Sequence, residues 1–442
     1  MIENKTYKAY GHHNFRDIPQ VQQFLSPEQQ HDIDVVGNVL PFKVNNYVVD
    51  ELIDWSNVPN DPIYALTFPQ REMLQPAHFQ HMEAAMAQNP SKAELKLAAN
   101  HIRYQLNPHP AGQMEHNVPE LNGIKLTGIQ HKYRQTVLFF PQHGQTCHAY
   151  CTFCFRWPQF VGMDELKFAM RETDLLIEYL QQHPEVTNVL FTGGDPLIMS
   201  ADRLKMYIEP LLEADLPNVH TIRLGTKALG YWPYRFINDK DSDELLALFE
   251  KASASGKHLT LMAHFNHLRE METDAVKEAI KRVRNTGVEI RTQSPVMRNI
   301  NDDPAVWRDM WREQVRQGCI PYYMFMARDT GAQDFFAVSL VRAWEIFQQA
   351  YQQVAGVCRT VRGPSMSAEP GKVQILGPCE IKGEKVLALR FLQGRNPNWV
   401  QRPFFAKYDE KAIWLDDLVP AFDDELFFYQ LEPQEEAFCY DE

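Results

Sequence analysis

The sequence predicts an α/β fold in which a parallel sheet forms the middle of the chain, with a helical N-terminal arm before it and a small β-rich cap after it. Three observations support this prediction. Short apolar runs alternate with amphipathic stretches, as repeated β/α units require. The crossovers of such units are right-handed, so the sheet curls into a full or partial barrel. Polar residues follow the apolar runs, where barrels of this type carry their chemistry.

Residues 1–130 are rich in Pro, Gln and Asn and contain only scattered short helical patterns. Ser26-Pro-Glu-Gln-Gln30 predicts a helix start with proline at the first position. Asn57-Val-Pro-Asn-Asp-Pro62 is typical of a turn. We expect this part to be an arm that wraps the core, and not an independent domain.

Residues 131–372 predict six β/α units in series, and hence a parallel sheet with helices outside it. The expected strands are the apolar runs at 136–140, 188–192, 219–225, 258–265, 287–293 and 320–327. The expected helices are the stretches near 164–182, 201–214, 241–255, 273–285, 303–316 and 335–353. Asp164-Glu165 and Ser242-Asp243-Glu244 supply caps and acidic first turns to two of these helices.

Residues 373–442 predict the cap, a group of short strands and turns. The expected strands are Val373-Gln-Ile-Leu376, Val386–Leu392, Phe404–Tyr408 and Ala412-Ile-Trp-Leu415. Acidic residues are frequent after the last of them.

The composition is that of a globular protein with a large core: 442 residues, 44% hydrophobic and 23% charged. The net charge of −13 argues against binding to nucleic acid or to anionic membranes. The chain begins without an apolar signal segment, and it has no run of about 18 apolar residues. Seven cysteines without framework spacing fit a reducing compartment. We therefore expect a cytoplasmic protein with no membrane or nucleic-acid partner.

Polar side chains follow every expected strand. In chain order they are Cys147, Cys151 and Cys154; Thr192-Gly-Gly-Asp-Pro196; Thr226 and Lys227; His264, Asn266 and His267; Gln293 and Ser294; and Arg328 and Asp329. Ordinary loop polarity would explain any one of these groups. The carboxyl ends of parallel strands meet at one rim, so we expect all six groups to surround one site.

The three clustered cysteines have the spacing C-x3-C-x2-C, in Cys147-His-Ala-Tyr-Cys151-Thr-Phe-Cys154. Three thiolates can hold three irons of a 4Fe-4S cluster and leave the fourth iron open to a small molecule. A structural zinc site would need a fourth ligand, for which His143 or His148 could serve. Disulfides are disfavoured because three cysteines leave one unpaired. The spacing favours a cluster over zinc or unligated thiols.

With Phe153 before the last cysteine, this arrangement resembles the radical S-adenosylmethionine enzymes. In those enzymes the cluster gives one electron to S-adenosylmethionine, and the resulting 5′-deoxyadenosyl radical abstracts a hydrogen atom from the substrate. Residues from about 45 to 400 look like the lysine 2,3-aminomutase family in particular, whose fold is a partial (β/α)6 radical-SAM barrel. The resemblance is carried by 131–154, Gly193-Gly-Asp195, His264-Phe-Asn-His267, Gln293-Ser294, Asn301-Asp302 and Pro321-Tyr-Tyr323.

The resemblance implies that Gly193, Gly194 and Asp195 bind the methionyl part of S-adenosylmethionine. Glycine suits this task because it lets the backbone approach a ligand closely, although a tight β/α turn would also explain the pair. The resemblance also makes His264 and Gln293 cofactor-binding residues, with Gln293 near the adenosyl ribose. For Gln293 the alternative is a polar pocket wall.

The family also uses pyridoxal 5′-phosphate, which stabilises a radical while an amino group moves between adjacent carbons. Lys372 matches the Schiff-base lysine of the family, but Ser367-Ala-Glu-Pro370 replaces the glycine run before it. Lys132 conservatively replaces one phosphate-binding arginine, and Thr136 replaces the other. We expect pyridoxal phosphate to be retained, the alternative for Lys372 being a solvated loop lysine.

The resemblance is most informative about the substrate. Arg156 matches the arginine that pairs with the substrate α-carboxylate, which a planar guanidinium can bind with two hydrogen bonds. The lysine enzymes hold the substrate ammonium with two aspartates. Arg328 stands at the first position, and Arg362 or Ser365 at the second, depending on how the loop is aligned. An arginine facing an ammonium is unfavourable, so we expect an acidic or polar substrate tail. In the alternative, Arg328 points away and pairs with Asp329, Asp334 or Glu369.

The zinc motif of the lysine enzymes is missing from this sequence. Asp303 stands at one ligand position, and the tail retains only Cys379 and Cys439. We expect no zinc, and a homodimer formed through other contacts stays open.

Together these features predict a 2,3-aminomutase that uses S-adenosylmethionine and pyridoxal phosphate and acts on a glutamate-like acid. An electron donor such as flavodoxin or ferredoxin would reduce the cluster. The alternative is a pyridoxal-independent radical enzyme that abstracts hydrogen from another anionic substrate. A non-catalytic iron–sulfur carrier would not need six polar strand ends.

Overall fold

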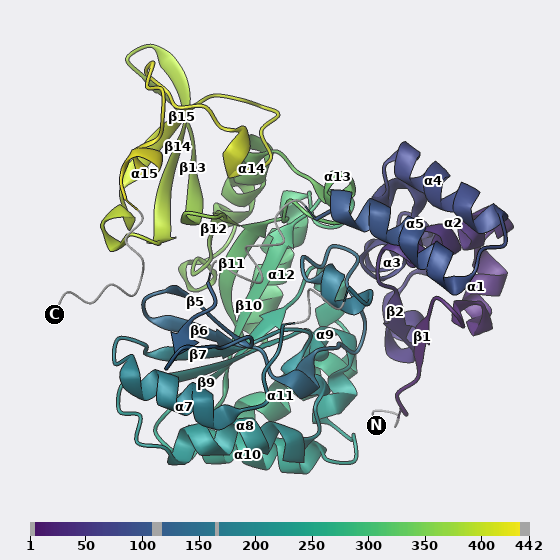
Figure 1. Cartoon of the computed structure of the whole chain (residues 1–442), viewed down its shortest axis with the longest axis horizontal. Helices are drawn as coiled ribbons and strands as arrows, with labels where there is room; N and C mark the ends of the chain where they lie inside the picture. The colour runs from purple at the N-terminus through teal and green to yellow at the C-terminus, as the bar shows by residue number, and fades with distance from the viewer. Residues whose placement is uncertain (1–4, 108–116, 164–167, 434–442) are drawn as a thin grey trace.

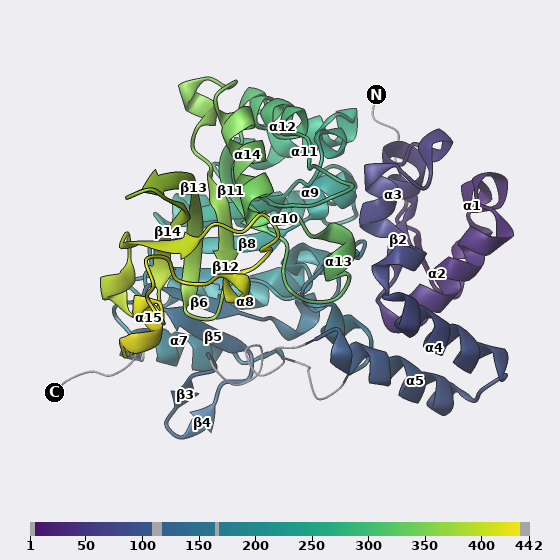
Figure 2. The same ribbon diagram turned by 90° about the horizontal axis from the view of Figure 1, so that it is seen from above.

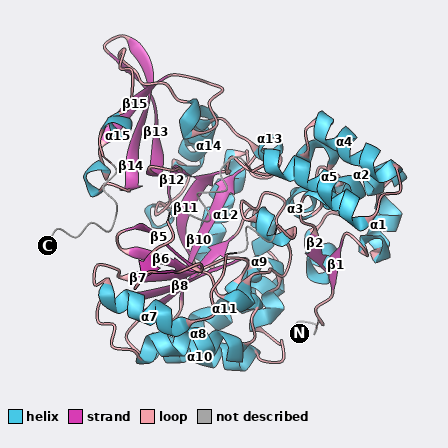
Figure 3. Cartoon of the chain, viewed as in Figure 1, coloured by secondary structure: helices cyan, strands magenta, loops and turns pink. Residues whose placement is uncertain are grey.

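The computed structural model describes residues 5–107, 117–163 and 168–433 and has mixed α/β structure around one large sheet (Figures 1 and 3). The sheet has eleven strands, each lying beside its neighbour in sequence. Among the described residues, no helix is long and apolar enough to cross a lipid bilayer.

Six consecutive strands of this sheet are parallel: β6 (Thr136–Phe139), β7 (Asn188–Phe191), β8 (Thr221–Thr226), β9 (His258–His264), β10 (Glu289–Val296) and β11 (Ile320–Met326). All six predicted strands are confirmed. Alternate residues of a strand point to opposite faces. The register aligns Val137, Val189 and Ile222 in one buried row of the core. The other face is free to carry polar side chains.

Helices follow the parallel strands: α7 (Thr173–Gln182), α8 (Ala201–Glu213), α9 (Ala228–Tyr231), α10 (Ser242–Ala254), α11 (Asp274–Asn285), α12 (Pro304–Arg316), α13 (Gln333–Phe336) and α14 (Leu340–Tyr351). Figure 1 shows α7, α8 and α10 side by side below the sheet. Right-handed β/α crossovers bring such helices to one side of a parallel sheet.

Three details of the predicted helices differ. The stretch 164–182 is helical from Thr173, and Asp164-Glu165 lie outside the described residues. The stretch 335–353 is broken because the Ser339 hydroxyl caps a new helix after α13. Ser242 is the first residue of α10 and not its cap. The residue before it, Asp241, directs its carboxylate to Arg235 and to the Ala201 N–H instead.

Short helices of residues 5–107 gather at one side of the sheet (Figure 2). They are α1 (Pro19–Phe24), α2 (Pro27–Val39), α3 (Pro62–Thr67), α4 (Pro76–Ala87) and α5 (Lys92–Gln105), accompanied by the paired strands β1 (Ala9–Gly11) and β2 (Lys43–Asn45). The predicted start of α2 is confirmed: the Ser26 hydroxyl accepts from the Gln29 N–H, and Pro27 is the first residue.

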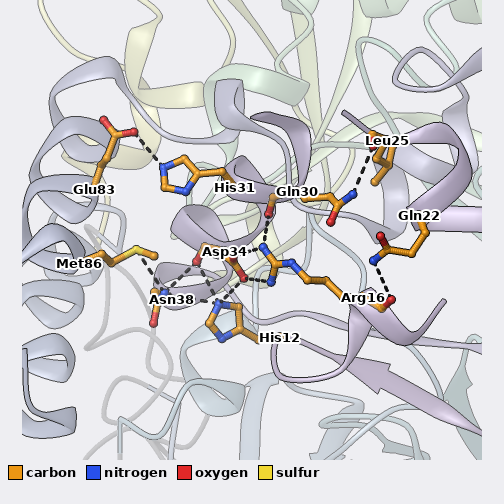
Figure 4. Close-up of polar contacts among 10 residues, drawn as sticks. All are labelled: His12, Arg16, Gln22, Leu25, Gln30, His31, Asp34, Asn38, Glu83 and Met86. Carbon is orange, nitrogen blue, oxygen red and sulfur yellow. Dashed lines mark hydrogen bonds and ion pairs between the residues drawn. The ribbon is translucent and has the colours of Figure 1, made fainter. Parts of the chain in front are cut away.

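Polar contacts hold α2 against its neighbours (Figure 4). The Asp34 carboxylate accepts from Arg16 Nη1 at 3.0 Å, and within α2 itself the Asp34 carbonyl accepts from Asn38 Nδ2 at 2.8 Å. His31 Nε2 lies 3.0 Å from Glu83 Oε1 of α4. Exposed polar pairs of this kind contribute little, typically about 0–1 kcal/mol. The buried apolar side of α2 is therefore the main source of its stability.

Further strands extend both edges of the sheet. At one edge, β5 (Ile129–Tyr133) is antiparallel to β6. At the other, β12 (Arg362–Ser367) is parallel to β11, and β13 (Gly371–Ile381), β14 (Glu384–Gly394) and β15 (Pro403–Lys407) follow in antiparallel order. The remaining elements are the pair β3 (Glu120–Leu121) and β4 (Ile124–Lys125) and the short helix α15 (Phe428–Leu431).

Three of the four predicted C-terminal strands are confirmed as β13, β14 and β15. The fourth, Ala412–Leu415, is wrong, because these residues form no strand. Asp417 Oδ2 accepts from the backbone N–H groups of Ile413 and Trp414, at 2.9 and 3.0 Å. This local carboxylate takes the donors that pairing with a sheet would require.

Candidate functional site

Asp195 ties the end of β7 to the end of β8. Its buried carboxylate accepts from the Thr226 hydroxyl at 2.8 Å and from the Lys227 N–H at 2.8 Å. Burial raises the pKa of Asp195, and hydrogen bonds from the backbone oppose this effect. In this structure the carboxylate holds two strand ends together. Its predicted contact with a cofactor stays a prediction.

Lys227 and Glu270 form a buried ion pair that continues the connection to the next strands. Lys227 Nζ donates to Glu270 Oε1 at 2.7 Å and to Asn266 Oδ1 at 2.8 Å. The Glu270 side chain is 0% exposed, so burial raises its pKa, while Lys227 lowers it. Asn266 Nδ2 in turn donates to Ser294 Oγ of β10 at 2.8 Å. One polar network thus joins the ends of four neighbouring strands.

His264 and Gln293 lie opposite each other in the register of β9 and β10. The Gln293 amide nitrogen is 2.7 Å from His264 Nε2. An amide nitrogen only donates, so this imidazole nitrogen accepts. Burial, and then the charge of Lys227, lower the pKa of His264 to about 3 and keep the ring neutral. The structure therefore brings these two predicted cofactor-binding residues together.

Gly193 and Gly194 pack against the segment that leads into the three cysteines. A Cβ on Gly194 would lie 2.4 Å from the Thr146 carbonyl oxygen and 2.5 Å from the Thr146 nitrogen. Gly193 has a φ of 130°, which side chains rarely allow. Close backbone packing is thus one reason for the glycine pair, whatever ligand it contacts.

N-terminal residues hold the cysteine loop, residues 147–154. Lys43 Nζ donates to the Cys147 carbonyl at 2.7 Å. The Tyr7 hydroxyl donates to the His148 carbonyl at 2.7 Å, and Asn45 Nδ2 donates to the same oxygen at 3.2 Å. In the order given, these three contacts join residues that are 104, 141 and 103 positions apart in the sequence. No short-range pattern in the sequence indicates these contacts.

The thiols of Cys147, Cys151 and Cys154 lie near one another. Burial raises the pKa of each, and for Cys147 the other two thiols raise it further. Among the described residues, no three His, Cys, Asp or Glu side chains converge closely enough to hold a single metal ion. In a 4Fe-4S cluster each thiolate bonds a separate iron. Three neighbouring thiols are therefore a donor set that fits such a cluster with one iron left open.

Neither histidine considered as a fourth zinc ligand is arranged as one. His143 Nδ1 lies 2.8 Å from the Tyr207 hydroxyl. Burial lowers the pKa of His148 to about 3, and its Nδ1 has no hydrogen-bond partner within the described part of the chain. Neither belongs to a group of metal-ligating side chains there.

Arg156 is a buried cation with open hydrogen-bond donors. Its side chain is 6% exposed, and its Cζ lies 4.2 Å from the centroid of the Phe140 ring. Its Nε and Nη2 have no hydrogen-bond partner in the described structure. Burial lowers the pKa of Arg156 to about 10, so it is still charged at neutral pH. Two open donors on one guanidinium suit a carboxylate.

Lys372 is half-buried in β13, with its ammonium against aromatic rings. Its Nζ lies 4.3 Å from the centroid of Tyr323 and 5.6 Å from that of Phe325. Burial lowers the pKa of Lys372 to about 7, and the charges of neighbouring arginines lower it further. This is a strand lysine with a large neutral fraction near pH 7, and not a solvated loop lysine.

Arg328 lies between the cysteine loop and the strand end after β11. Its Cζ is 5.1 Å from the centroid of Phe155, the residue after Cys154. Burial lowers the pKa of Arg328, and the adjacent Asp329 opposes this shift. The two other carboxylates considered as partners are engaged elsewhere: Glu369 pairs with Arg395 at 3.0 Å, and Asp334 bonds Gln75.

Lys132 and Arg362 are the remaining predicted cations. Lys132 Nζ donates to the Ala368 carbonyl at 2.6 Å, and burial lowers its pKa to about 7. Arg362 Nη1 donates to the Tyr323 hydroxyl at 3.1 Å. Ser365, the other candidate for the second aspartate position, is buried.

Sequence reasoning missed Arg223, in the middle of β8. Its Nε donates to Asn188 Oδ1 of β7 at 2.8 Å. Its charge also acts on Lys372, whose pKa it lowers. The sequence did contain a sign of this residue, since Arg223 is a charged residue between the apolar Ile222 and Leu224. In a strand, its side chain lies on the face opposite these two buried side chains.

The chain is similar to several curated proteins, although no protein-family model matches it. A protein of Aquifex aeolicus, provisionally named L-lysine 2,3-aminomutase, is 31% identical over 394 residues, covering 89% of this chain and 91% of that protein. The L-lysine 2,3-aminomutase of Acetoanaerobium sticklandii is 25% identical over 334 residues, covering 76% and 69%. That of Escherichia coli is 26% identical over 248 residues, covering 56% and 68%.

Among solved structures, the native anSMEcpe with bound AdoMet is 11% identical, with a TM-score of 0.32. The likeness covers 44% of this chain and 52% of that chain. No conclusion about this protein rests on it.

Proposed function

This chain belongs to the lysine 2,3-aminomutase family of radical S-adenosylmethionine enzymes, and we propose that it moves the α-amino group of an acidic, glutamate-like amino acid to the β-carbon. Membership follows from 31% identity over 394 residues, which cover 91% of the Aquifex aeolicus relative. It makes the protein an enzyme, an aminomutase. One observation chiefly supports the acidic substrate: Arg328 stands where the lysine enzymes place an aspartate, and its charge acts on Lys372 together with those of Arg223 and Arg362.

The residues present fit the groups that the family uses. The cluster ligands would be Cys147, Cys151 and Cys154. The S-adenosylmethionine site would be lined by Gly193, Gly194, Asp195, His264 and Gln293. When bound, these groups supply a carbon-centred radical that takes a hydrogen atom from the substrate, and pyridoxal phosphate supports the movement of the amino group.

We propose Lys372 as the residue that binds pyridoxal 5′-phosphate. Its pKa of about 7 leaves much of the amine neutral near neutral pH, and only the neutral amine is a nucleophile. Lys132 would contribute positive charge near the phosphate. One observation favours the pyridoxal-independent alternative: Lys132 Nζ already donates to the Ala368 carbonyl, and Thr136 replaces the second basic residue.

The charges support an anionic substrate tail. Arg156, with its two open donors, would take the α-carboxylate. Arg328 and Arg362 would then meet the far end of the substrate. Two like charges about 5 Å apart repel by roughly 3 kcal/mol at an effective dielectric constant near 20. A substrate ammonium at this place would be excluded, whereas a carboxylate would be held.

We further propose that the six parallel strands form the partial (β/α)6 barrel of the family. The contact of Arg328 with Phe155 supports curvature, because it joins the loops after β6 and β11. The division into an arm (1–130), a barrel (131–372) and a cap (373–442) stays a prediction. So do the flavodoxin or ferredoxin donor and a homodimer.

Anaerobic incubation with a reductant, S-adenosylmethionine and deuterated amino acids tests the proposed reaction. We expect deuterium to pass from glutamate into 5′-deoxyadenosine, and none to pass from lysine. Mass spectrometry of the 5′-deoxyadenosine measures this transfer. Transfer from lysine, with none from any acidic amino acid, would reject the proposed substrate.

Borohydride reduction followed by peptide mapping tests the place of pyridoxal. We expect a pyridoxyl group on Lys372, and none after Lys372→Ala. A label on another lysine, or no binding of pyridoxal phosphate, would reject this part and leave the pyridoxal-independent radical enzyme.

A further inference from the structure

Several cations gather around two adjacent tyrosines of β11. Arg362 Cζ lies 4.5 Å from the ring centroid of Tyr322, and its Nη1 donates to the Tyr323 hydroxyl at 3.1 Å. Lys372 Nζ lies 4.3 Å from the ring centroid of Tyr323. Arg291 Cζ lies 5.2 Å from that of Tyr322. Aromatic faces attract cations, but two rings offset only part of the repulsion among three positive charges.

Arg223 joins this group from β8, although two strands separate β8 from β11 in the sheet. The alternation of β8 directs it away from the buried side chains of Ile222 and Leu224. Its field acts on Lys372, and the charge of Arg362 acts on Arg223. Its Nε is taken by Asn188, which leaves the two terminal nitrogens of the guanidinium available.

Carboxylates do not balance this group. Arg291 forms an ion pair with Glu289, so its positive charge is balanced within the protein. Within the described ranges, no Asp or Glu forms an ion pair with Arg223, Arg362 or Lys372. Two guanidinium cations, with the partly protonated Lys372 in their field and no paired carboxylate among the described residues, disfavour the free state. An anion placed among them would relieve that repulsion.

We propose that Arg223, Arg362 and Lys372 enclose an oxyanion-binding site beside the two tyrosines of β11, with Arg223 as a direct ligand. A planar guanidinium binds carboxylates and phosphates alike through paired hydrogen bonds. The inference rests on the proposed function, in which Lys372 carries the reacting group. The oxyanion would be the tail carboxylate of the substrate or the phosphate of pyridoxal phosphate, which share this chemistry.

The site is distinct from the one at Arg156. That guanidinium stacks on Phe140 and lies beside the thiols of the cysteine loop. Arg362 instead lies over both tyrosines of β11, and these tyrosines also act electrostatically on Arg223. A ligand with two anionic groups would therefore find one cationic site at each end.

Isothermal titration calorimetry of the full chain, with inorganic phosphate and with glutarate as probes, tests the site without turnover. Glutarate carries the two carboxylates of glutamate but no amino group. We expect Arg223→Gln and Arg362→Gln each to weaken the binding of at least one probe tenfold or more. We expect Arg223→Lys, which keeps the charge but loses the planar fork, to weaken it by about threefold.

Arg390→Gln is a matched control. Arg390 is also a half-buried strand arginine whose Nε donates to a side-chain amide, that of Gln374, at 2.9 Å. It lies in β14, outside the group around the tyrosines. We expect less than a twofold change in binding for this variant. Melting temperatures identify any variant that fails to fold, and Arg223→Lys then carries the test.

Unchanged binding of both probes by folded Arg223→Gln or Arg223→Lys protein would overturn the site. So would an equal loss with Arg390→Gln, which would indicate a general effect of charge.

A second pair of titrations identifies the source of the oxyanion. If Arg223 holds the coenzyme phosphate, Arg223→Gln weakens pyridoxal phosphate binding tenfold and leaves pyridoxal binding within twofold. If it holds the substrate tail, glutarate still binds protein loaded with pyridoxal phosphate and does so through Arg223. Neither readout needs turnover. Intact oxyanion binding in a protein without aminomutase activity would therefore reject the proposed function alone.

Discussion

The candidate site has two halves, one near the cysteines and one around Lys372, and they balance their charges in different ways. Near the cysteines, Lys227 is paired with the buried Glu270, and the Asp195 carboxylate is satisfied by hydrogen bonds from the end of β8. Around Lys372, Arg223 and Arg362 have no carboxylate among the described residues. In the first half, Lys227 and Asp195 are balanced within the protein, whereas Arg156 keeps open hydrogen-bond donors in the described structure. The second half needs an anion from outside to become neutral.

This difference indicates a division of labour. A half whose polar groups satisfy one another is preorganised and needs no ligand to set its geometry. A half with unbalanced charge favours ligands of the opposite sign and rejects others. The cysteine half would thus support chemistry that the whole family shares. The Lys372 half would decide which amino acid reacts.

The largest effect should follow from breaking the cysteine half. Cys151→Ala removes one of three proposed iron ligands, so we expect no reductive formation of 5′-deoxyadenosine. Iron content should fall from about four per chain, the stoichiometry of the cluster. Chromatography of 5′-deoxyadenosine and iron analysis measure the two effects. Cys379→Ala, at an exposed cysteine of β13, should leave both unchanged. Normal 5′-deoxyadenosine formation by Cys151→Ala would contradict the assignment.

The next effect tests whether internal pairing stabilises this half. Glu270→Ala leaves Lys227 as a buried cation without its partner, which should destabilise the fold by about 3–5 kcal/mol. Urea unfolding monitored by circular dichroism measures the free energy of unfolding. Lys251 pairs with Glu209 at 2.8 Å, but its side chain is 49% exposed. Glu209→Ala should therefore change stability by about 0–1 kcal/mol. Equal losses in the two variants would mean that burial of the pair is unimportant.

Reversing one charge in the other half should affect ligands more than folding. We expect Arg328→Asp to weaken an acidic substrate by about 2–5 kcal/mol, the usual penalty for losing one partner of a buried charge pair. It should not create lysine activity, because Arg223 and Arg362 would remain. Deuterium transfer at several substrate concentrations measures the change. Arg342→Asp, on the exposed side of α14, is the control. If Arg328→Asp retained normal affinity, Arg328 would not contact the substrate.

The smallest effect is a gain in stability when a charge is removed from the Lys372 half. The pKa of Lys372 is about 7 in the folded protein, against an ordinary value of 10.5. Between these values the unfolded chain binds more protons, so the stability of the unchanged protein rises with pH. Lys372→Met should therefore stabilise the fold at pH 7, and the gain should shrink as the pH approaches 10.5.

Urea unfolding at pH 7 and pH 9.5 checks this prediction. Lys251 is the control, because the hydrogen bonds that it donates to Glu209 and Glu213 raise its pKa and give the opposite sign. Lys251→Met should bring no stabilisation at pH 7. A loss of stability in Lys372→Met at pH 7 would show that its charge is already balanced.

The regular elements of the fold were predictable because they depend on local periodicity. All six apolar runs between 136 and 327 are strands, and Ser26 starts a helix as its neighbours indicate. Prediction failed at Ala412–Leu415, where an apolar run is turned by the nearby Asp417 carboxylate. It also placed one helix start too early, before Thr173. At Ala412–Leu415 a side-chain contact competed with the apolar pattern. Before Thr173 the helical pattern extended beyond the actual start of the helix.

The candidate site was predictable only in part, for a similar reason. The sequence places His264 and Gln293 at the ends of successive strands, and the structure brings the two side chains together there. The support of the cysteine loop by Lys43 joins residues 104 apart, and no spacing rule connects them. Arg223 was hidden because a single charge in an apolar run does not reveal what it faces.

The sequence by itself determined the series of parallel strands and the family, because these depend on spacing along the chain and on residue identity. Only the tertiary structure decided which charges are paired. Lys227 and Glu270 lie 43 residues apart and meet at 2.7 Å. Arg223 and Lys372 come from distant strands, and the charge of Arg223 lowers the pKa of Lys372. Coulomb energies depend on distance in space and on burial, and folding alone sets both.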